Sequence, residues 1–499
     1  MKKLNKNKLK LILLLFLAEL ILIKCQKLES SKNVMNIPRE HYVTNMSSIT
    51  RYKKGKDYIL SLKLSSKQNI TNIINRIEKN ITIIISKTIL KEENININMG
   101  LIDDITLQNS KNNGKIIINL KRNIRHEINF DDNSNLSIIL KNIMDTSSLK
   151  PTSKDIKDFH FKTFNIDLHN DLLFQLFMKN LSLAKEYSFT ESDLPKLTKG
   201  GVHSVFFSVW IPDYFLKNAD KLNIYKDYFP KFDYYKGKPF EMTIALIDKL
   251  LYELEKQDKI KLAFSSKDLI TNWKRGVKSA LIGLEGAHPL EGKLERLKIL
   301  YDKGIRYIGI TWSNTNDFAD AAGDFTHNGL SPLGKKLIKE MMKLGMLIDV
   351  SHCSDNTFYD ILKITDYKYP IIASHSSSRV LLNHKRNLTD DMLNAIKKSN
   401  GIVGIVFHSG FLTKNKRATI ENVLNHIDYF VEKTSINNVA IGSDFDGFIN
   451  TPLNLENMSK LPNLTLGLYN RGYSHNDIEK IMGKNFLRVF RKVEKLKQN

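Results

Sequence analysis

Histidines and acidic residues recur at the ends of short apolar runs in the second half of the chain. The runs FNIDL, SALIGL, MLIDVS, PIIAS and VAIGS are each followed within a few residues by such a side chain. A buried charge is costly unless it is paired or binds a metal. We therefore expect these side chains to form one cluster that binds metal or exchanges protons: His169, Asp171, Glu285, His352, His375 and Asp444.

The spacing of His169 and Asp171 suits a shared metal ion. Side chains two residues apart on extended backbone point to the same side, so one cation can take both. Neutral imidazole and carboxylate are ligands of zinc and similar divalent ions. His352 and His375 supply a second pair of donors, and Glu285 could bridge two ions. Two ions that share a water lower its pKa and polarise a carbonyl group, which is the chemistry of amide hydrolysis.

Asp444 stands in the segment GSDFDG, directly after the last apolar run. This position suits a group that accepts a proton from the attacking water and returns it to the leaving amine. Asp446, in the same segment, is expected to hold a turn.

Eight strand-like runs must bring these residues together: FNIDL, VHSVFFSVW, SALIGL, IRYIGIT, MLIDVS, PIIAS, GIVGIVF and VAIGS. Helical patterns lie between most of them, for example over residues 241–257 and 331–345. Eight alternations of strand and helix predict an α/β protein with a (β/α)8 TIM barrel, whose reactive groups lie past the carboxyl ends of the strands. A doubly wound sheet is the alternative, but the Gly-rich phosphate turn that often follows its first strand is absent.

Five segments carry a family resemblance: DLHNDLL, LEGAHPL, IDVSHCSD, IIASHSSSRVLLNHKRNLTDDML and AIGSDFDGF. From about residue 160 to 495 the chain resembles the membrane dipeptidase (renal dipeptidase) family, peptidase family M19 of the metal-dependent amidohydrolase superfamily. The resemblance implies two zinc ions, one bound by His169 and Asp171 and the other by His352 and His375. It implies that Glu285 and a hydroxide bridge the two ions.

The same resemblance implies that Asp444 is the proton shuttle. It also implies that Arg386 binds the terminal carboxylate of the substrate, a role suited to a planar fork of donors. Two positions depart from the better-known members. Trp312 stands where a His helps to hold the substrate carbonyl, and His408 replaces a substrate-lining Tyr. The metal ligands are unaffected by these changes, whereas specificity and rate depend on them.

The expected function is hydrolysis of dipeptides by a zinc-dependent enzyme. One rival is a related amidohydrolase acting on N-acyl amino acids, lactams or lactones. A second rival, of another class, is a non-catalytic surface-binding protein. Members of the family often pair through their barrels, so a homodimer is a further expectation.

The first 150 residues lie outside the resemblance. Lysines in the first ten residues precede the apolar run LILLLFLAELILI, which predicts a signal peptide or membrane anchor over 1–25, with export, membrane contact and possible lipid attachment at Cys25. Residues 26–50 are expected to be a tether, 51–145 a small β-rich (α+β) domain with one helix at NITNIINRIEKN, and 146–160 a linker to the barrel at 161–499.

The net charge of +23 comes from 76 Lys and Arg against 53 Asp and Glu over 499 residues. The lysines are scattered and form no tight basic helix or aromatic-interleaved stripe, so we expect no nucleic-acid partner. An acidic membrane surface stays possible as a partner. The two cysteines build no disulfide framework, and Cys353 is expected to be a packing residue.

Overall fold

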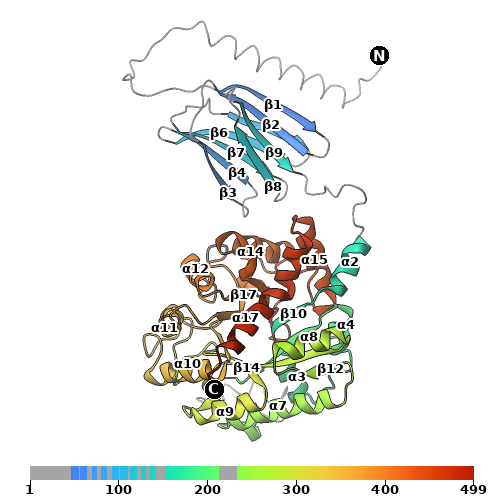
Figure 1. The fold of residues 1–499 in the computed structure, drawn as a ribbon, viewed down its shortest axis with the longest axis vertical. Helices are drawn as coiled ribbons and strands as arrows, with labels where there is room; N and C mark the ends of the chain where they lie inside the picture. Colours follow the sequence, from blue (N-terminus) through green and yellow to red (C-terminus); the bar gives the residue numbers. More distant parts are fainter. Residues whose placement is uncertain are drawn as a thin grey trace. The chain divides into compact units, whose positions relative to one another are not determined.

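The computed structural model describes nine strands between residues 46 and 141, and the segments 153–212 and 233–498 (Figure 1). The chain divides into two compact units, Met1–Ser147 and Ser148–Asn499. The predicted signal peptide or anchor, Cys25 and residues 26–45 of the predicted tether lie outside the described residues. The tether's last residues, from Met46, belong to strand β1.

The first unit contains two antiparallel sheets, with strand orders β1-β2-β9-β8 and β3-β4-β7-β6-β5. On β7, Ile116 and Ile118 are fully buried and Lys115 and Ile117 are not, the period-two pattern of a strand with one face in a core. A β-rich domain was predicted here, and this is confirmed. The strands are β1 (Met46–Lys54), β2 (Asp57–Leu64), β3 (Ile70–Asn75), β4 (Asn80–Ser86), β5 (Glu93–Met99), β6 (Ile102–Ser110), β7 (Asn113–Leu120), β8 (Arg125–Phe130) and β9 (Asn135–Lys141).

The helix predicted at NITNIINRIEKN is wrong. Ile70–Asn75 form strand β3, which pairs antiparallel with β4. Isoleucine and threonine are β-branched and restricted in a helix, and the isoleucines of β4 offer a matching partner run. Pairing with the neighbouring strand therefore decides the structure of this segment. The described residues of the first unit contain strands and no helix.

The second unit is built on eight parallel strands in the order β10-β11-β13-β14-β15-β16-β17-β18. A parallel bridge between Asn170 and Phe445 joins the first strand to the end of the last, and closes the barrel. The eight runs predicted from the sequence all form strands; β12, which pairs with β13, is an addition. The strands are β10 (Ile166–Asn170), β11 (Ser204–Trp210), β12 (Ile260–Leu262), β13 (Lys278–Glu285), β14 (Ile305–Gly309), β15 (Leu347–Asp349), β16 (Ile371–Ser376), β17 (Ile402–Ile405) and β18 (Val439–Ile441).

Helices surround the barrel. In α10 the side chain of Ser331 caps the N-terminus by accepting from Gly334 N, and Gly345 ends the helix at a φ of 68°, a conformation that glycine adopts without strain. The helices are α2 (Ser153–Lys162), α3 (Leu172–Met178), α4 (Leu194–Lys199), α7 (Pro239–Glu255), α8 (Ser266–Lys274), α9 (Glu295–Asp302), α10 (Pro332–Leu344), α11 (Asp355–Thr365), α12 (Asp390–Lys398), α13 (Ser409–Leu412), α14 (Ile420–Lys433), α15 (Leu461–Asn470), α16 (His475–Glu479) and α17 (Asn485–Lys495).

Helix α2 overlaps the segment 146–160, for which the sequence predicted a linker, and extends to Lys162. His160, on α2, is fully buried, and its ring nitrogens lie 2.7 Å from Thr465 Oγ1 and 2.8 Å from Gly200 O. The part of the segment from Ser153 onward is therefore tied to the barrel unit by a buried polar network.

The core of the barrel unit is apolar and aromatic. Tyr307, Phe206 and Phe486 are fully buried, and Phe206 contacts the rings of both others. Burying a large side chain of this kind contributes about 1.5–3 kcal/mol to folding. This core fixes the strands whose ends carry the polar residues.

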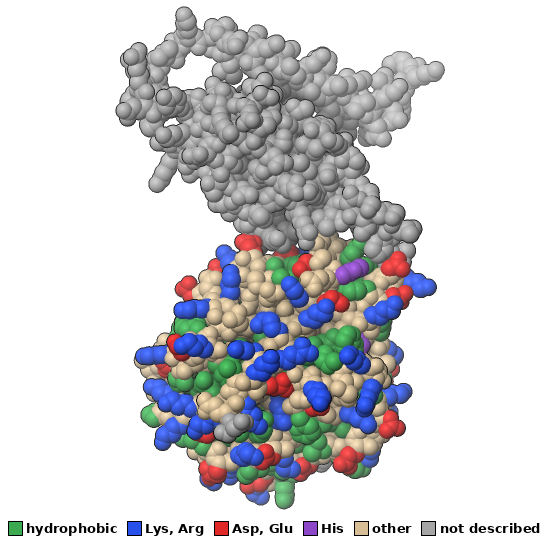
Figure 2. Space-filling model, in the orientation of Figure 1, with side chains coloured by type: hydrophobic (Ala, Val, Ile, Leu, Met, Phe, Trp, Pro, Cys, Tyr) green, Lys and Arg blue, Asp and Glu red, His purple; other side chains and the backbone are tan. Residues whose placement is uncertain are grey.

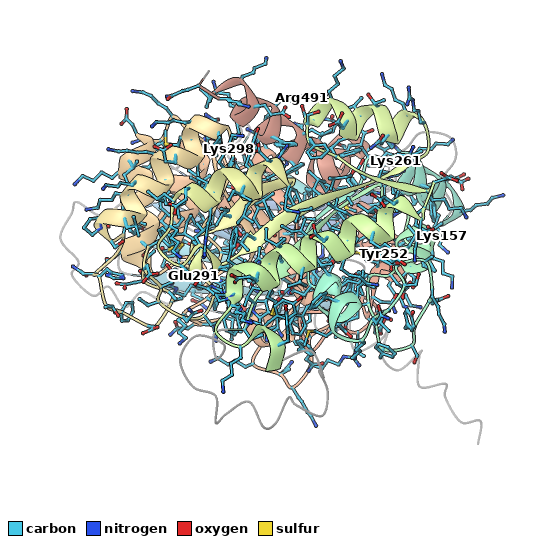
Figure 3. The ribbon with its side chains drawn as sticks, turned by 90° about the horizontal axis from the view of Figure 1, so that it is seen from below. Lys157, Tyr252, Lys261, Glu291, Lys298 and Arg491 are labelled. Atoms are coloured by element: carbon cyan, nitrogen blue, oxygen red, sulfur yellow. The ribbon has the colours of Figure 1, made fainter. Side chains whose placement is uncertain are left out.

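Cationic side chains are spread over the surface of the barrel unit (Figure 2). Lys157 on α2, Lys261 on β12, Lys298 on α9 and Arg491 on α17 are all exposed, and each projects from a different element (Figure 3). Among the residues that the structure describes, none of the helices is both long and apolar enough to cross a membrane.

Candidate metal centre

The predicted donors lie together at the carboxyl ends of the barrel strands. Each follows or ends a different strand, except that β10 supplies two, and the exposed fraction of each is 9% or less. They are His169 in β10, Asp171 just after it, Glu285 at the end of β13, His352 after β15, His375 in β16 and Asp444 after β18.

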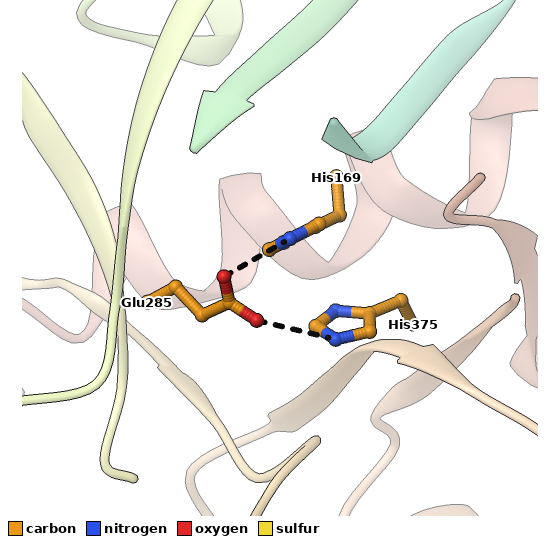
Figure 4. A group of neighbouring side chains, drawn as sticks. All are labelled: His169, Glu285 and His375. Atoms are coloured by element: carbon orange, nitrogen blue, oxygen red, sulfur yellow. Dashed lines mark ion pairs between the residues drawn. The ribbon is translucent and has the colours of Figure 1, made fainter. Parts of the chain in front are cut away.

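The two carboxylate oxygens of Glu285 face different histidines (Figure 4). Oε2 lies 3.7 Å from His169 Nε2, whereas Oε1 lies 2.8 Å from His352 Nε2 and 3.6 Å from His375 Nε2. A carboxylate between two sets of imidazoles has the arrangement that a ligand shared by two cations needs.

His169 also faces two further acids. Its Nε2 lies 3.5 Å from Asp171 Oδ2 and 3.8 Å from Asp444 Oδ1. Ligand atoms of His169, Asp171 and Asp444 lie within 4.8 Å of one another, as do those of His169, Glu285 and His375. The five predicted ligands and Asp444 are therefore one connected group.

His375 is held by hydrogen bonds that lead to Asp349. Ser374 Oγ donates to Asp349 Oδ2 at 2.6 Å and lies 2.9 Å from His375 Nδ1. Because the hydroxyl proton goes to the carboxylate, Ser374 Oγ accepts from Nδ1–H, and Nε2 keeps its lone pair. This Nε2 atom of His375 faces the Glu285 carboxylate and lies 2.9 Å from Nε2 of His352. Acceptors that converge in this way favour a cation between them.

Burial shifts the pKa of several side chains in the cluster. It raises the pKa of Glu285 well above its usual range, and the Asp171 carboxylate raises it further. It lowers the pKa of His352 and of His375 well below the usual value, so both rings are neutral, the form that binds metal.

The orphaned polar atoms agree with this chemistry. His169 Nε2 and Asp171 Oδ1 are buried without a hydrogen-bond partner among the described residues. Buried polar atoms without a partner call for a missing ion or water. The residues thus fit divalent cations.

Asp444 lies in a tight segment of the rim. Its φ is 65°, in the left-handed region, and its N–H donates to His169 O at 2.9 Å. A Cβ on Gly447 would lie 2.7 Å from Asp171 Oδ2 and 2.9 Å from Asp444 Oδ1, so a larger residue there would displace these carboxylates. Burial raises the pKa of Asp444 to about 7, against the lowering effect of His169.

A cavity of about 160 Å³ opens above these donors. Arg386 lines it, is 7% exposed, and has no hydrogen-bond partner for Nε or Nη1 among the described residues. Trp312 and His408, the other two predicted substrate-binding residues, also line the cavity. A buried guanidinium with free donors in a small cavity is suited to an anion the size of a carboxylate.

Some acidic and histidine side chains near the strand ends do other work. Asp167 accepts from the N–H and hydroxyl of Ser443, and His288 Nε2 lies 2.8 Å from Ile211 O. Asp446, at a φ of 64°, accepts from Gln175 and the Glu191 N–H, as a turn residue should.

Burial raises the pKa of the Cys353 thiol to about 12, so the side chain packs in the core and is not a nucleophile at neutral pH.

Several residues of the site were not predicted from the sequence. Trp210 and Phe448 line the cavity, and Tyr307 OH lies 2.8 Å from His169 Nδ1. In the sequence these aromatic residues look like ordinary core positions. Asp349 and Ser374 flank predicted ligands, and that adjacency was the one signal that could have found them.

A closed α/β barrel with buried imidazoles and carboxylates at the carboxyl ends of its strands defines a class of proteins with a metal site at the rim. Residues 153–499 match the family Membrane dipeptidase (Peptidase family M19). The chain belongs to this family and is an enzyme of the metallopeptidase type, whose activity is that of a dipeptidase.

Individual relatives agree with this assignment. An uncharacterized dipeptidase of Schizosaccharomyces pombe is 34% identical over 349 residues, which are 66% of this chain and 80% of that protein. Dipeptidase 3 of Rattus norvegicus is 30% identical over 344 residues, 67% of this chain and 66% of that protein. A metallo peptidase from Rhodobacter sphaeroides, crystallised with a phosphinate mimic of the dipeptide L-Ala-D-Ala, has a TM-score of 0.58 and 25% identity and covers 66% of this chain and 99% of its own.

Proposed function

We propose that this chain hydrolyses dipeptides with two zinc ions. His169 and Asp171 would hold one ion and His352 and His375 the other, with Glu285 as a ligand available to both. The observation that carries the proposal is the placement of the Glu285 carboxylate, with one oxygen 3.7 Å from His169 and the other 2.8 Å from His352. Imidazole and carboxylate donors of this kind suit zinc.

The side chains around the cavity have separate roles in the reaction. Two cations bound at this site would lower the pKa of a bound water and polarise the carbonyl group of the substrate. Asp444 accepts the proton of the attacking water and passes it to the nitrogen of the leaving amino acid. Arg386 binds the free carboxylate and so fixes the scissile bond over the donors. The cavity volume of about 160 Å³ suits a small substrate.

Metal analysis combined with a dipeptide assay tests this function. The purified chain should contain two zinc ions and cleave dipeptides, and removing the zinc with a chelator should abolish cleavage. His352→Ala and His375→Ala should each lower the metal content, because each removes a ligand from the second ion. A chain that keeps two ions in both variants would contradict the assignment of these ligands.

The rival amidohydrolase function differs in what it requires of the substrate. A dipeptidase that uses Arg386 needs a free carboxylate at the C-terminal residue, so a dipeptide amide should be cleaved poorly. Faster cleavage of lactams or lactones than of any dipeptide would favour the rival.

Location and assembly are proposed from the sequence. The apolar run near the N-terminus supports export, with contact between that segment and the membrane, and the family supports a homodimer. Fractionation of cells and size-exclusion chromatography of the purified chain test the two proposals separately.

A further inference from the structure

Three aromatic side chains form one wall of the cavity: Trp210, Trp312 and Phe448. The ring of Trp210 lies 5.3 Å from that of Trp312 and 6.3 Å from that of Phe448, centroid to centroid. Phe174, buried behind them, packs edge-on against Trp210 at 4.8 Å. The wall is thus a preformed apolar surface supported from the core.

Phe448 is unusual within this wall. Its side chain is 62% exposed, and its backbone has a φ of 55°, which is strained for a bulky residue. Neither the exposure of the ring nor the backbone strain helps the fold. Strain of this kind persists at ligand-binding sites, where the surrounding structure enforces it. At the mouth of the cavity, the exposed ring is available to a ligand.

Trp210, whose ring contacts the two other rings of the wall, lies on the opposite side of the barrel from Arg386. Trp210 ends β11, and β16 is four strands away in the closed eight-stranded sheet, which places it directly across. Arg386 follows β16, and its Nη2 lies 3.5 Å from the carbonyl oxygen of His375 on that strand. A dipeptide whose carboxylate binds Arg386 therefore extends its N-terminal residue across the metal donors toward the aromatic wall.

We propose that Trp210, Trp312 and Phe448 form a subsite for a large apolar side chain on the N-terminal residue of the substrate. This inference rests on the proposed function, because Arg386 sets the direction of the dipeptide. Among the described residues that line the cavity, Arg386 is the one Lys or Arg, and it is bound to the other end. An acidic side chain at the N-terminal residue would therefore be buried against aromatic rings without a cationic partner.

The test compares kcat/KM for Leu-Gly, Phe-Gly, Gly-Gly, Asp-Gly and Gly-Phe. The chain should cleave Leu-Gly and Phe-Gly faster than Gly-Gly by roughly tenfold or more, the discrimination that apolar pockets achieve. Gly-Phe, which carries its ring on the other residue, should not share the advantage, and Asp-Gly should be the poorest substrate.

Two variants then place the selectivity at the wall. Phe448→Ala removes the ring, and Phe448→Asn removes it with a residue that tolerates the left-handed backbone. In both, the ratio of kcat/KM for Phe-Gly over Gly-Gly should fall severalfold, chiefly through KM. Phe325→Ala is the matched control, because Phe325 is 68% exposed and does not line the cavity, and its ratio should stay that of the parent chain.

The outcomes are distinguishable. If the parent chain cleaves none of the dipeptides, the proposed function fails and the subsite fails with it. If it cleaves Gly-Gly as well as Phe-Gly, or prefers Gly-Phe, the function stands and the subsite is overturned. An unchanged ratio in both Phe448 variants would also overturn it.

Discussion

Asp444 is the residue at which metal binding and turnover can be separated. It faces His169 at 3.8 Å and lines the cavity, yet it is outside the set of five proposed ligands. Asp444→Asn keeps the size of the side chain and removes its capacity to accept a proton. We expect kcat to fall by roughly 10²- to 10⁴-fold while the zinc content stays the same.

Atomic absorption and a dipeptide assay on the same preparation check this prediction. A variant that loses zinc as well as turnover would make Asp444 a ligand. Full turnover would remove it from the mechanism.

At the scale of single residues, charge and spacing in the sequence are enough to predict the polar residues of the site. His169, Glu285 and His352 can be predicted because burying an imidazole or a carboxylate costs free energy unless it is paired or binds a metal. Phe448 could not be found in this way, since an aromatic residue in a sequence looks the same in a core and at a cavity mouth. Its exposure and backbone conformation belong to the folded chain.

At the scale of elements, strands β15 and β16 together orient one proposed ligand, His375. Asp349 ends β15 and accepts from Ser374, which precedes His375 on β16. Removing either partner frees the imidazole to rotate or to change tautomer. We expect Ser374→Ala and Asp349→Asn each to weaken zinc binding by roughly 10- to 100-fold, the usual effect of losing such support.

Competition titration of the metal-free chain with zinc measures the effect directly. Ser376→Ala is the matched control, since Ser376 is buried on the same strand and its hydroxyl has no hydrogen-bond partner among the described residues. Equal losses of affinity in the Ser374 and Ser376 variants would mean that general disturbance of β16, and not the hydrogen bond, is responsible.

The elements themselves were largely predictable. Buried parallel strands give continuous apolar runs, and capped helices give periodic patterns, so the eight strands and helices such as α10 follow from local sequence. The helix predicted at NITNIINRIEKN failed because pairing with the next strand, β4, decides that structure. Strand β12 is only Ile260–Leu262 and pairs at the edge of β13, which is too short to leave a pattern.

At the scale of the whole molecule, buried neutral histidines should make stability depend on pH. Burial lowers the pKa of His160, His203 and His426 to about 4, from 6.5. Between these two values the unfolded chain binds protons that the folded chain does not. The contribution of these histidines to stability is therefore complete above pH 6.5 and falls as the pH drops toward 4, by up to about 3 kcal/mol for each histidine.

Urea unfolding of the metal-free chain at pH 7 and pH 5 measures this loss. In His426→Gln one titrating group is gone, so the difference in unfolding free energy between the two pH values should shrink. An equal difference in the parent chain and the variant would assign the acid sensitivity to other groups.

The hydrogen bonds between the ends of the first and last strands determine when the metal site can form. Asp171 donates its N–H to Phe445 O, and Asp444 donates to His169 O, so the ends of β10 and β18 hold each other in place. A ribosome releases His169 and Asp171 long before it reaches Asp444. A nascent chain therefore carries the proposed ligands before the barrel that aligns them has closed, and we expect full metal binding only in the compartment where the barrel closes.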